Sequence, residues 1–190
     1  MKVTAVLGSP RDNSNSTRLA AEAVMASGAR KEEVAKFFLD KLTIKGCRAC
    51  ASCKTGSEVC VINDDLSEVL NSVSKADFVI LTAPIYIGDI SSQQKTFIDR
   101  SFSLLKPDFR TNPQPGRLGQ DRKLLFIITQ RRPQKSFYGQ IIASYVEYFR
   151  NMGFNAASFI ATDLGEEDIV TTRPELLREV AEIVSGLFNL

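Results

Sequence analysis

The chain has 190 residues, 44% hydrophobic and 24% charged, a composition that fits one globular domain spanning 1–190. Its 24 Lys and Arg against 22 Asp and Glu leave a net charge of +2, which gives no reason to expect nucleic acid or an anionic membrane as a partner. There is no His and no Trp, and the absence of His excludes Ser-His-Asp triads, HExxH zinc sites and imidazole acid–base catalysis.

The first predicted elements are a strand, a helix and a second strand. Residues 2–8 form a short apolar, β-branched run that predicts a buried strand ending near Leu7, followed by turn-forming residues. Residues 17–29 carry apolar side chains at helical spacing, with small polar N-cap candidates before them. Residues 34–39 predict the second strand.

The middle of the chain alternates in the same way. Residues 63–76 predict a helix with Asn63 as its N-cap, and residues 77–86 form the clearest buried strand of the sequence. Residues 91–105 have apolar side chains at helical spacing. Residues 106–122 contain Pro and Gly among polar residues and predict a long surface loop.

The last third of the chain supplies two more strands, which complete the fold prediction. Residues 124–129 and 154–161 predict strands, and a final helix begins near Pro174. Residues 137–152 predict a helix whose apolar stripe consists of Phe137, Ile141, Tyr145 and Phe149. Five strands alternating with helices predict an α/β fold, a doubly wound five-stranded parallel sheet with helices on both faces.

The loop from Ser9 to Thr17 follows the first strand, at the edge where doubly wound sheets bind ligands. It lacks the GxGxxG and GxxxxGK[ST] spacings of the common phosphate loops, but it is rich in hydroxyl and amide side chains and contains Arg11. A helix N-terminus completed by such donors suits the phosphate of a mononucleotide such as FMN. An ordinary polar turn with a helix cap has the same composition, so both interpretations stay open.

A second loop at the same edge follows the strand 77–86. Pro84 fixes the direction of the chain, Tyr86 supplies an aromatic face, and Gly88 permits close approach of the backbone. Such a segment can line a flat ring with polar edges, although a strand-to-helix turn with a packed Tyr is the simpler alternative. The two loops together favour a flavin site more than either does alone.

The four cysteines lie within a loop of residues 46–61 and have the spacing C-x2-C-x2-C-x6-C. No signal peptide or run of about 18 apolar residues is present, so we expect a cytoplasmic protein, where close-spaced cysteines favour metal binding or redox chemistry over structural disulfides. Compact C-x2-C-x2-C runs are typical of iron–sulfur ligation. Zinc bound by four thiolates, and free or disulfide-switching thiols, are the alternatives. The candidate ligands are Cys47, Cys50, Cys53 and Cys60.

Three segments together carry a specific resemblance. GSPRDNSNSTRL, the cysteine run leading into CVINDDL, and APIYIGDISSQQKTFIDR resemble the iron-sulfur flavoproteins, a branch of the flavodoxin-like NAD(P)H-dependent FMN reductases. This resemblance implies a flavodoxin-like sheet and a 4Fe-4S cluster on the four cysteines. It also implies a homodimer or homotetramer that brings the cluster and flavin of different subunits together, and a ferredoxin-like redox partner.

The resemblance also implies which residues bind FMN. The phosphate is expected around Ser9, Arg11, Asn15, Ser16 and Thr17. The isoalloxazine ring is expected near Pro84, Ile85, Tyr86, Ile87 and Gly88.

One segment departs from the family pattern. Where the family commonly has a Gly-rich turn beside the flavin, this chain has TQRRPQKSFYG at residues 129–139, so the third wall of the ring pocket is open to question. Arg131 and Arg132 in this segment could bind the phosphate of NADPH, although adjacent Arg residues in loops are commonly solvated.

The patterns predict a flavin-containing oxidoreductase with a metal or redox site on the cysteines, and the resemblance implies that this is an FMN-containing electron-transfer protein with a 4Fe-4S cluster that passes electrons from a ferredoxin-like or NAD(P)H donor to an acceptor. The cofactors would carry out the chemistry, so no catalytic side chain is needed. One alternative is an NAD(P)H-dependent FMN or quinone reductase without a metal cluster. Another is a zinc-stapled, non-catalytic binding module that uses residues 110–135 as a nucleic-acid contact, which the near-neutral charge disfavours.

Overall fold

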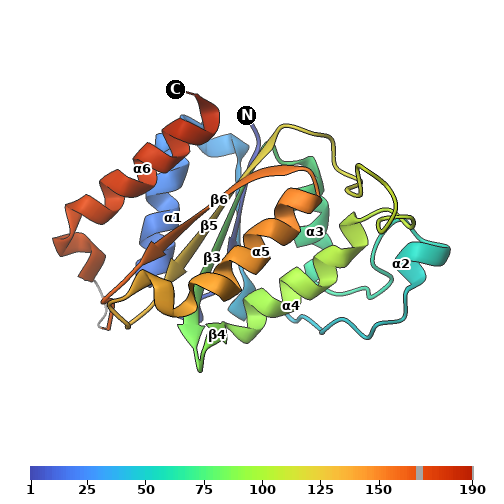
Figure 1. The fold of residues 1–190 in the computed structure, drawn as a ribbon, viewed down its shortest axis with the longest axis horizontal. Coiled ribbons are helices and arrows are strands. Elements are labelled where there is room, and N and C mark those ends of the chain that lie inside the picture. The colour runs from blue at the N-terminus through green and yellow to red at the C-terminus, as the bar shows by residue number, and fades with distance from the viewer. Residues whose placement is uncertain (166–168, 190) are drawn as a thin grey trace.

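The computed structural model describes residues 1–165 and 169–189 and contains the predicted parallel sheet (Figure 1). The strand order is β2-β1-β3-β5-β6, with all four neighbouring pairs parallel. The strands are β1 (Val3–Leu7), β2 (Val34–Phe38), β3 (Phe78–Tyr86), β5 (Arg122–Thr129) and β6 (Phe154–Ala161). A two-residue strand, β4 (Asp89–Ile90), pairs antiparallel with the end of β3 and was not predicted.

Helices cover both faces of the sheet, as predicted (Figure 1). On one face lie α1 (Asn15–Ala26) and α6 (Pro174–Phe188). On the other lie α3 (Leu66–Lys75), α4 (Ser92–Ser101) and α5 (Gly139–Asn151). The short α2 (Ser52–Thr55) lies in the cysteine loop. Single 3-10 turns occur at Lys31–Glu33, Leu39–Lys41, Phe102–Leu104, Lys135–Tyr138 and Ile169–Thr172.

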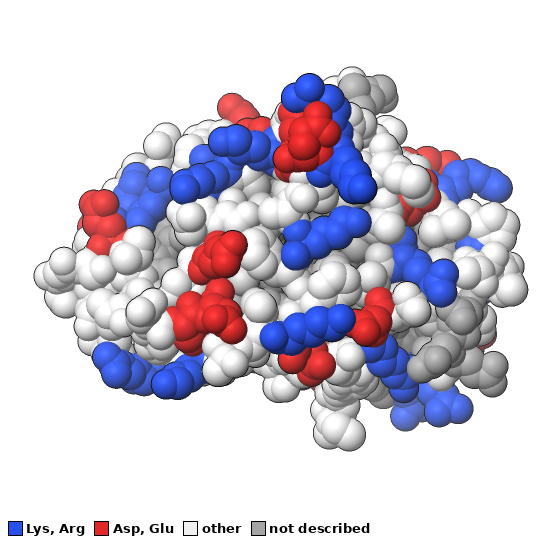
Figure 2. Space-filling model, turned by 180° about the vertical axis from the view of Figure 1, so that it is seen from behind, with Lys and Arg blue, Asp and Glu red and all other residues white. Residues whose placement is uncertain are grey.

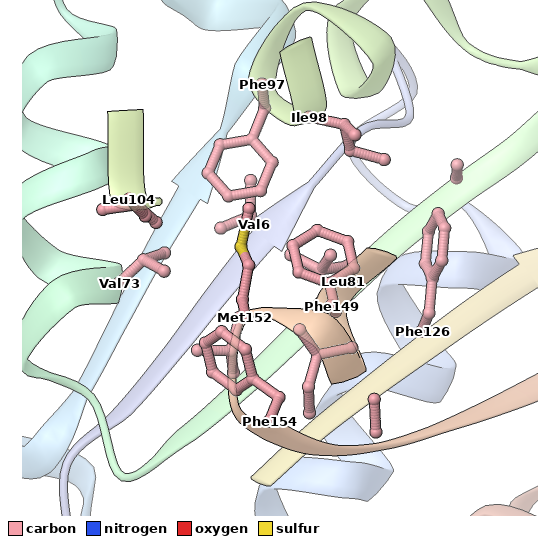
Figure 3. Packing of buried hydrophobic residues seen from close by; sticks show 14 of the residues in the cluster. Val6, Val73, Leu81, Phe97, Ile98, Leu104, Phe126, Phe149, Met152 and Phe154 are labelled. Atoms are coloured by element: carbon pink, nitrogen blue, oxygen red, sulfur yellow. The ribbon is translucent and has the colours of Figure 1, made fainter. Parts of the chain in front are cut away.

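The strands form where the sequence is continuously apolar, because both faces of the sheet are buried. All five residues of β1 are buried, and so are the first six of β3. On the face of α3, α4 and α5, Figure 3 shows Phe97 and Ile98 packing over the sheet near Val6 and Leu81. Phe149 joins them from α5, so this face has one continuous apolar core.

Two helices differ in detail from the prediction. The helix predicted from Asn63 begins instead at Leu66, because the carboxylates before it bind the backbone of the segment after β2: Asp65 accepts from the N–H of Thr43 and Asp64 from that of Lys45. These contacts come from residues about 20 positions away, which local capping rules do not consider.

The predicted apolar stripe of α5 is also wrong in part. A 3-10 turn at Lys135–Tyr138 delays the start of the helix to Gly139. Phe137 and Ile141 are therefore exposed, at 57% and 37% of their surface. The buried positions of the helix are Ile142, Val146 and Phe149.

The surface carries charge of both signs. Figure 2 shows Lys and Arg side chains interspersed with Asp and Glu over one face, in keeping with the net charge of +2. Within the loop 106–122, Lys106 N–H donates to Pro115 O, and Arg117 N–H joins the loop to the 3-10 turn after α4 by donating to Leu104 O, both at 2.8 Å. Among the helices described, none combines the length and apolar character needed to cross a membrane.

Candidate functional site

The loop after β1 gathers hydroxyl groups at the N-terminus of α1. Ser14 is the N-cap, and its Oγ accepts from Thr17 N–H at 3.2 Å. The same Oγ lies 3.0 Å from Ser16 Oγ and 2.8 Å from Thr17 Oγ1, while Ser9 Oγ accepts from the N–H of Arg11 at 3.2 Å. These donors surround the positive end of a 12-residue helix, an arrangement that favours a bound anion.

Gly8 brings this loop against the segment that follows β3. Its N–H donates to Thr82 O at 2.9 Å, and its carbonyl accepts from Ser91 Oγ at 2.6 Å. A Cβ at this position would lie 2.6 Å from Thr82 O and 2.7 Å from Gln94 Cβ, both too close. A residue without a side chain is therefore required where the two loops meet.

A cleft of about 300 Å³ opens between these loops. Most of the residues predicted for FMN line it: Ser9, Arg11, Asn15, Ser16, Pro84, Ile85 and Tyr86. The remaining three lie beside it. Thr17 is in the first turn of α1, while Ile87 and Gly88, with φ of 47° and 90°, form the tight turn between β3 and β4. The loops after β1 and β3 therefore line one cleft.

The third wall of the cleft is formed by Thr129, Gln130 and Arg131 after β5, together with Leu164 and Gly165 after β6. The side chain of Gln130, which is 2% exposed as a residue, donates from Nε2 to the carbonyls of Arg132 and Gln134, both at 2.9 Å. Its backbone bonds to Ala161 and Leu164. A bulky turn is thus ordered here by an amide side chain, and no local sequence pattern indicated it.

The two arginines of this turn diverge. Arg131 lines the cleft beside Gly165, where a Cβ would come within 3.2 Å of Arg131 Nε. The guanidinium of Arg132 lies instead over the Phe137 ring, 5.0 Å from its centroid. Of the pair, only Arg131 borders the cleft in the described part of the chain.

The cysteine segment has an irregular backbone. Ala49 and Ala51 both adopt the left-handed conformation, with φ of 53° and 56°, on either side of Cys50. The Ser52 hydroxyl donates to Cys50 Sγ at 3.4 Å, and this bond, with a smaller contribution from Arg48, lowers the pKa of the exposed Cys50 thiol to about 7. Non-glycine residues in the left-handed conformation are uncommon, because the conformation is strained and persists only where the surrounding structure holds the backbone in place.

All four cysteines line a second cavity, of about 670 Å³. Its other walls are side chains of α4, the turn after it and α5, among them Ile98, Phe102, Tyr145 and Tyr148. From the carboxyl end of β2, the cysteine segment runs out onto the helical layer (Figure 1). Within residues 1–165 and 169–189, no residue lines both cavities.

Two cations attach the cysteine segment to the end of α4. Lys54 Nζ donates to the carbonyls of Phe102 and Leu105, at 2.6 and 2.8 Å. Arg117, from the loop 106–122, donates to Cys53 O at 3.1 Å and to Leu105 O at 3.0 Å. These contacts place positive charge beside thiols that a metal centre would need as thiolates.

The thiols fit an iron–sulfur centre by chemistry but are not assembled around one. Four cysteines facing one cavity with Arg48, Lys95 and Arg100 in its walls form a suitable donor set for a negatively charged cluster. In the described residues, however, no three Cys, Asp, Glu or His side chains are near enough to share a metal ion. Binding of a metal centre would require the cysteine segment to bring its thiols closer together.

A hydrogen bond connects the two sites. Tyr145, which lines the cysteine cavity, donates its hydroxyl to both carboxylate oxygens of Asp89, at 3.0 and 3.3 Å. Asp89 pairs across the β3–β4 hairpin with Tyr86, which lines the cleft. Burial, followed by the hydrogen bond to Asp89 and the charge of that carboxylate, raises the pKa of Tyr145 well above its ordinary value, so this hydroxyl keeps its proton.

Comparisons with known proteins identify the family of the chain. The family model for NADPH-dependent FMN reductase matches residues 1–130. An iron-sulfur flavoprotein of Methanosarcina thermophila is 32% identical over 116 residues, 61% of this chain and 60% of the relative. Another from Methanocaldococcus jannaschii is 38% identical over 101 residues, 53% of this chain and 52% of the relative. The chain thus matches little more than half the length of these relatives.

Solved structures show the same fold over nearly the whole chain. An FMN-dependent NADH-azoreductase from Bacillus anthracis superposes with a TM-score of 0.73 over 98% of this chain and 99% of its own, at 16% identity. An NADH:FMN oxidoreductase gives a TM-score of 0.62 over 98% of this chain and 87% of its own, at 18% identity. At such identities the likeness concerns the fold. The family model, by contrast, covers well over half of the sequence, and the chain belongs to the NADPH-dependent FMN reductase family.

Proposed function

We propose that the protein is a flavin-dependent oxidoreductase that binds FMN in the cleft at the carboxyl ends of β1, β3 and β5. The observation that carries this proposal is the junction of a hydroxyl-rich helix N-terminus with the β3–β4 hairpin in one cleft. Ser9, Arg11, Asn15, Ser16 and Thr17 would bind the phosphate. The ring would lie along the five residues from Pro84 to Gly88.

The chain's own part in the reaction is to bind and orient. Bound FMN accepts a hydride or single electrons, so the protein needs no histidine acid or base. Tyr86, 45% exposed at the edge of the cleft, offers an aromatic face, and Gln130 fixes the opposite wall through its two hydrogen bonds. Both Arg11 and Arg131 line the cleft; with Arg11 assigned to the FMN phosphate, Arg131 would be the cation for an NADPH phosphate.

The second part of the proposal is a 4Fe-4S cluster on Cys47, Cys50, Cys53 and Cys60. It is supported by the compact spacing, by the common cavity and by the names of the relatives from Methanosarcina thermophila and Methanocaldococcus jannaschii. Four free thiols at this spacing suit the reducing cytoplasm. Electrons would pass between a ferredoxin-like or NAD(P)H donor and an acceptor.

A homodimer or homotetramer belongs to this proposal. The cysteine cavity lies on the helical layer, while the cleft lies at the strand edge, and they share no lining residue among those described. Association of two chains could bring the cluster of one next to the flavin of the other. The oligomeric state in solution, measured by light scattering, tests this point.

A cluster-free NAD(P)H-dependent FMN or quinone reductase is the second candidate, favoured by the separation of the thiols. Iron, sulfide and flavin analysis of anaerobically purified protein separates the two. Iron and sulfide in about fourfold molar amounts, lost in Cys50→Ser while FMN stays bound, would support the cluster. Flavin without iron, with rapid reduction of free flavin by NADPH, would support the reductase. Stoichiometric zinc without flavin would refute both.

The FMN site has its own test. Ser16→Ala removes a buried hydroxyl at the N-terminus of α1, and Ser27→Ala removes one at the other end of the same helix. A hydrogen bond to a charged phosphate contributes about 1.5–3 kcal/mol, so Ser16→Ala should weaken FMN binding by about 10-fold to 150-fold. Ser27→Ala should leave it unchanged. Equal effects of the two substitutions would place the phosphate elsewhere.

A further inference from the structure

Arg100 is the most completely buried charged residue of the cysteine region. It lies near the end of α4, its side chain is 0% exposed, and it pairs with Asp64, 5% exposed, at 2.8 Å between Nη1 and Oδ2. A guanidinium without access to water must be matched by acceptors on several sides. The positions of these acceptors show which parts of the chain Arg100 joins.

The acceptors lie on both sides of the cysteine segment. Nη1 donates to the carbonyl of Lys45, just before Cys47, and Nη2 to the carbonyl of Ile62, just after Cys60, both at 3.0 Å. One side chain therefore joins the two ends of the segment that carries the four thiols. No other residue of α4, all of which the structure describes, bonds to both Lys45 and Ile62.

Asp64 completes the arrangement from the other direction. Its Oδ2 accepts from Lys45 N–H at 2.8 Å and its Oδ1 from Leu66 N–H at 3.2 Å. The carboxylate thus orients the guanidinium and holds the same end of the segment. Both members of this buried ion pair therefore bind the ends of the cysteine segment.

The guanidinium also faces the thiols. Arg100 and Cys60 line the same cavity, and burial, which would lower the pKa of Arg100, is outweighed by the hydrogen bond with Asp64 and by Cys60, which raise it. Within the described residues, Arg100 Nε is buried and has no hydrogen-bond partner. A buried cation with an unused N–H donor next to a ligand thiol is suited to hydrogen-bond a metal-bound sulfur.

We propose that Arg100, oriented by Asp64, is a positioning residue of the cysteine site. It joins the two ends of the cysteine segment and raises the reduction potential of the cluster bound there. This inference rests on the proposed cluster. Reduction adds negative charge to the cluster, so a fixed cation nearby stabilises the reduced form. Removing the cation should therefore make reduction harder.

The test compares Arg100→Gln and Asp64→Asn in anaerobically purified holoprotein, by redox titration followed by EPR. Arg100→Gln should lower the midpoint potential, because it removes a positive charge. Asp64→Asn should raise it, because it removes a negative one. A merely structural role would loosen the segment in both variants and shift both potentials in the same direction, or in neither.

Lys95→Gln is the matched control. Lys95 lies on the same helix and lines the same cavity, but it is 43% exposed and pairs with Asp99. Water screens its charge, so its loss should move the potential less than the loss of Arg100. Removal of iron by a chelator should be about 10-fold to 100-fold faster in Arg100→Gln and unchanged in Lys95→Gln.

Arg100→Lys keeps the test decisive if Arg100→Gln does not fold. Lysine retains the charge but not the fork that reaches both carbonyls, so the potential should stay near that of the wild type while chelator removal is faster. A potential unchanged in Arg100→Gln, or shifted alike in Arg100→Gln and Asp64→Asn, would overturn the inference. Wild-type protein without iron would instead refute the proposed cluster, and the potential-setting role with it.

Discussion

Alanine at Gly8 should damage both stability and FMN binding, because Gly8 lies where the two loops of the cleft meet. The new Cβ would lie 2.6 Å from Thr82 O and 2.7 Å from Gln94 Cβ, whereas ordinary contacts begin near 3.4 Å. Thr82 O belongs to the central strand β3 and cannot retreat. Overpacking of this kind costs about 1–3 kcal/mol. For a chain of this size, each kcal/mol lowers Tm by about 2–4 °C.

Part of this strain would be relieved by a shift of the loop after β1, and FMN binding would have to reverse the shift. A penalty of about 1–3 kcal/mol on the bound form corresponds to a 5-fold to 150-fold weaker Kd. Urea unfolding and quenching of FMN fluorescence measure the two effects. Gly186→Ala is the control of opposite sign, since Gly186 lies inside α6 with no neighbour within 4 Å, and alanine there should stabilise by about 1 kcal/mol. Unchanged FMN affinity in a destabilised Gly8→Ala protein would refute the cleft assignment.

Three further substitutions test local features. Ser14→Ala removes the N-cap of α1 and should cost about 0.5–2 kcal/mol in chemical unfolding, with weaker FMN binding; full stability would contradict the capping role. Gly116→Ala should destabilise by about 3 kcal/mol or more, because its Cβ would overlap the carbonyl of Met152; an unchanged Tm would show that the loop 106–122 adapts. Burial alone would raise the pKa of Asp64, but hydrogen bonds from Arg100 and two backbone N–H groups lower it below its ordinary value of 3.8. The stability that these bonds contribute is complete above that value and lost as the pH falls below it, so the stability difference between wild type and Asp64→Asn should narrow below about pH 4; a constant difference down to pH 2 would refute the shift.

The sheet could be predicted because its signal is local and repeated. Each parallel strand is a continuous apolar run, as the burial of β1 and of the first six residues of β3 shows, and the alternation with helices then fixes the architecture. The two loops of the cleft followed from a general rule, since the loops after neighbouring parallel strands open at one edge. The general location of the cleft therefore needed no side-chain detail.

The features that the sequence did not predict depend on partners distant along the chain. Asp64 and Asp65 bind backbone about 20 residues earlier instead of extending α3, so the helix starts late. Gln130 orders the third wall through carbonyls that become its neighbours only after the turn has formed. Arg100, on α4, binds the carbonyls of Lys45 and Ile62 at the two ends of the cysteine segment. A polar side chain that bonds to backbone leaves no periodic pattern in a sequence, so only the folded structure reveals these three contacts.

Two sites that share no lining residue can still be mechanically connected in one chain. The Tyr86–Asp89 pair is the end of the β3–β4 hairpin, and Asp89 is bonded to Tyr145, which forms part of the cysteine cavity. Tyr145 therefore links a wall of the cysteine cavity to the hairpin through one short side-chain contact. The neutral Tyr145 hydroxyl donates to a carboxylate, which is a stronger bond than one between neutral groups. If FMN occupies the cleft as we propose, this bond joins a wall of the cysteine cavity to the hairpin whose Tyr86 lines the flavin site.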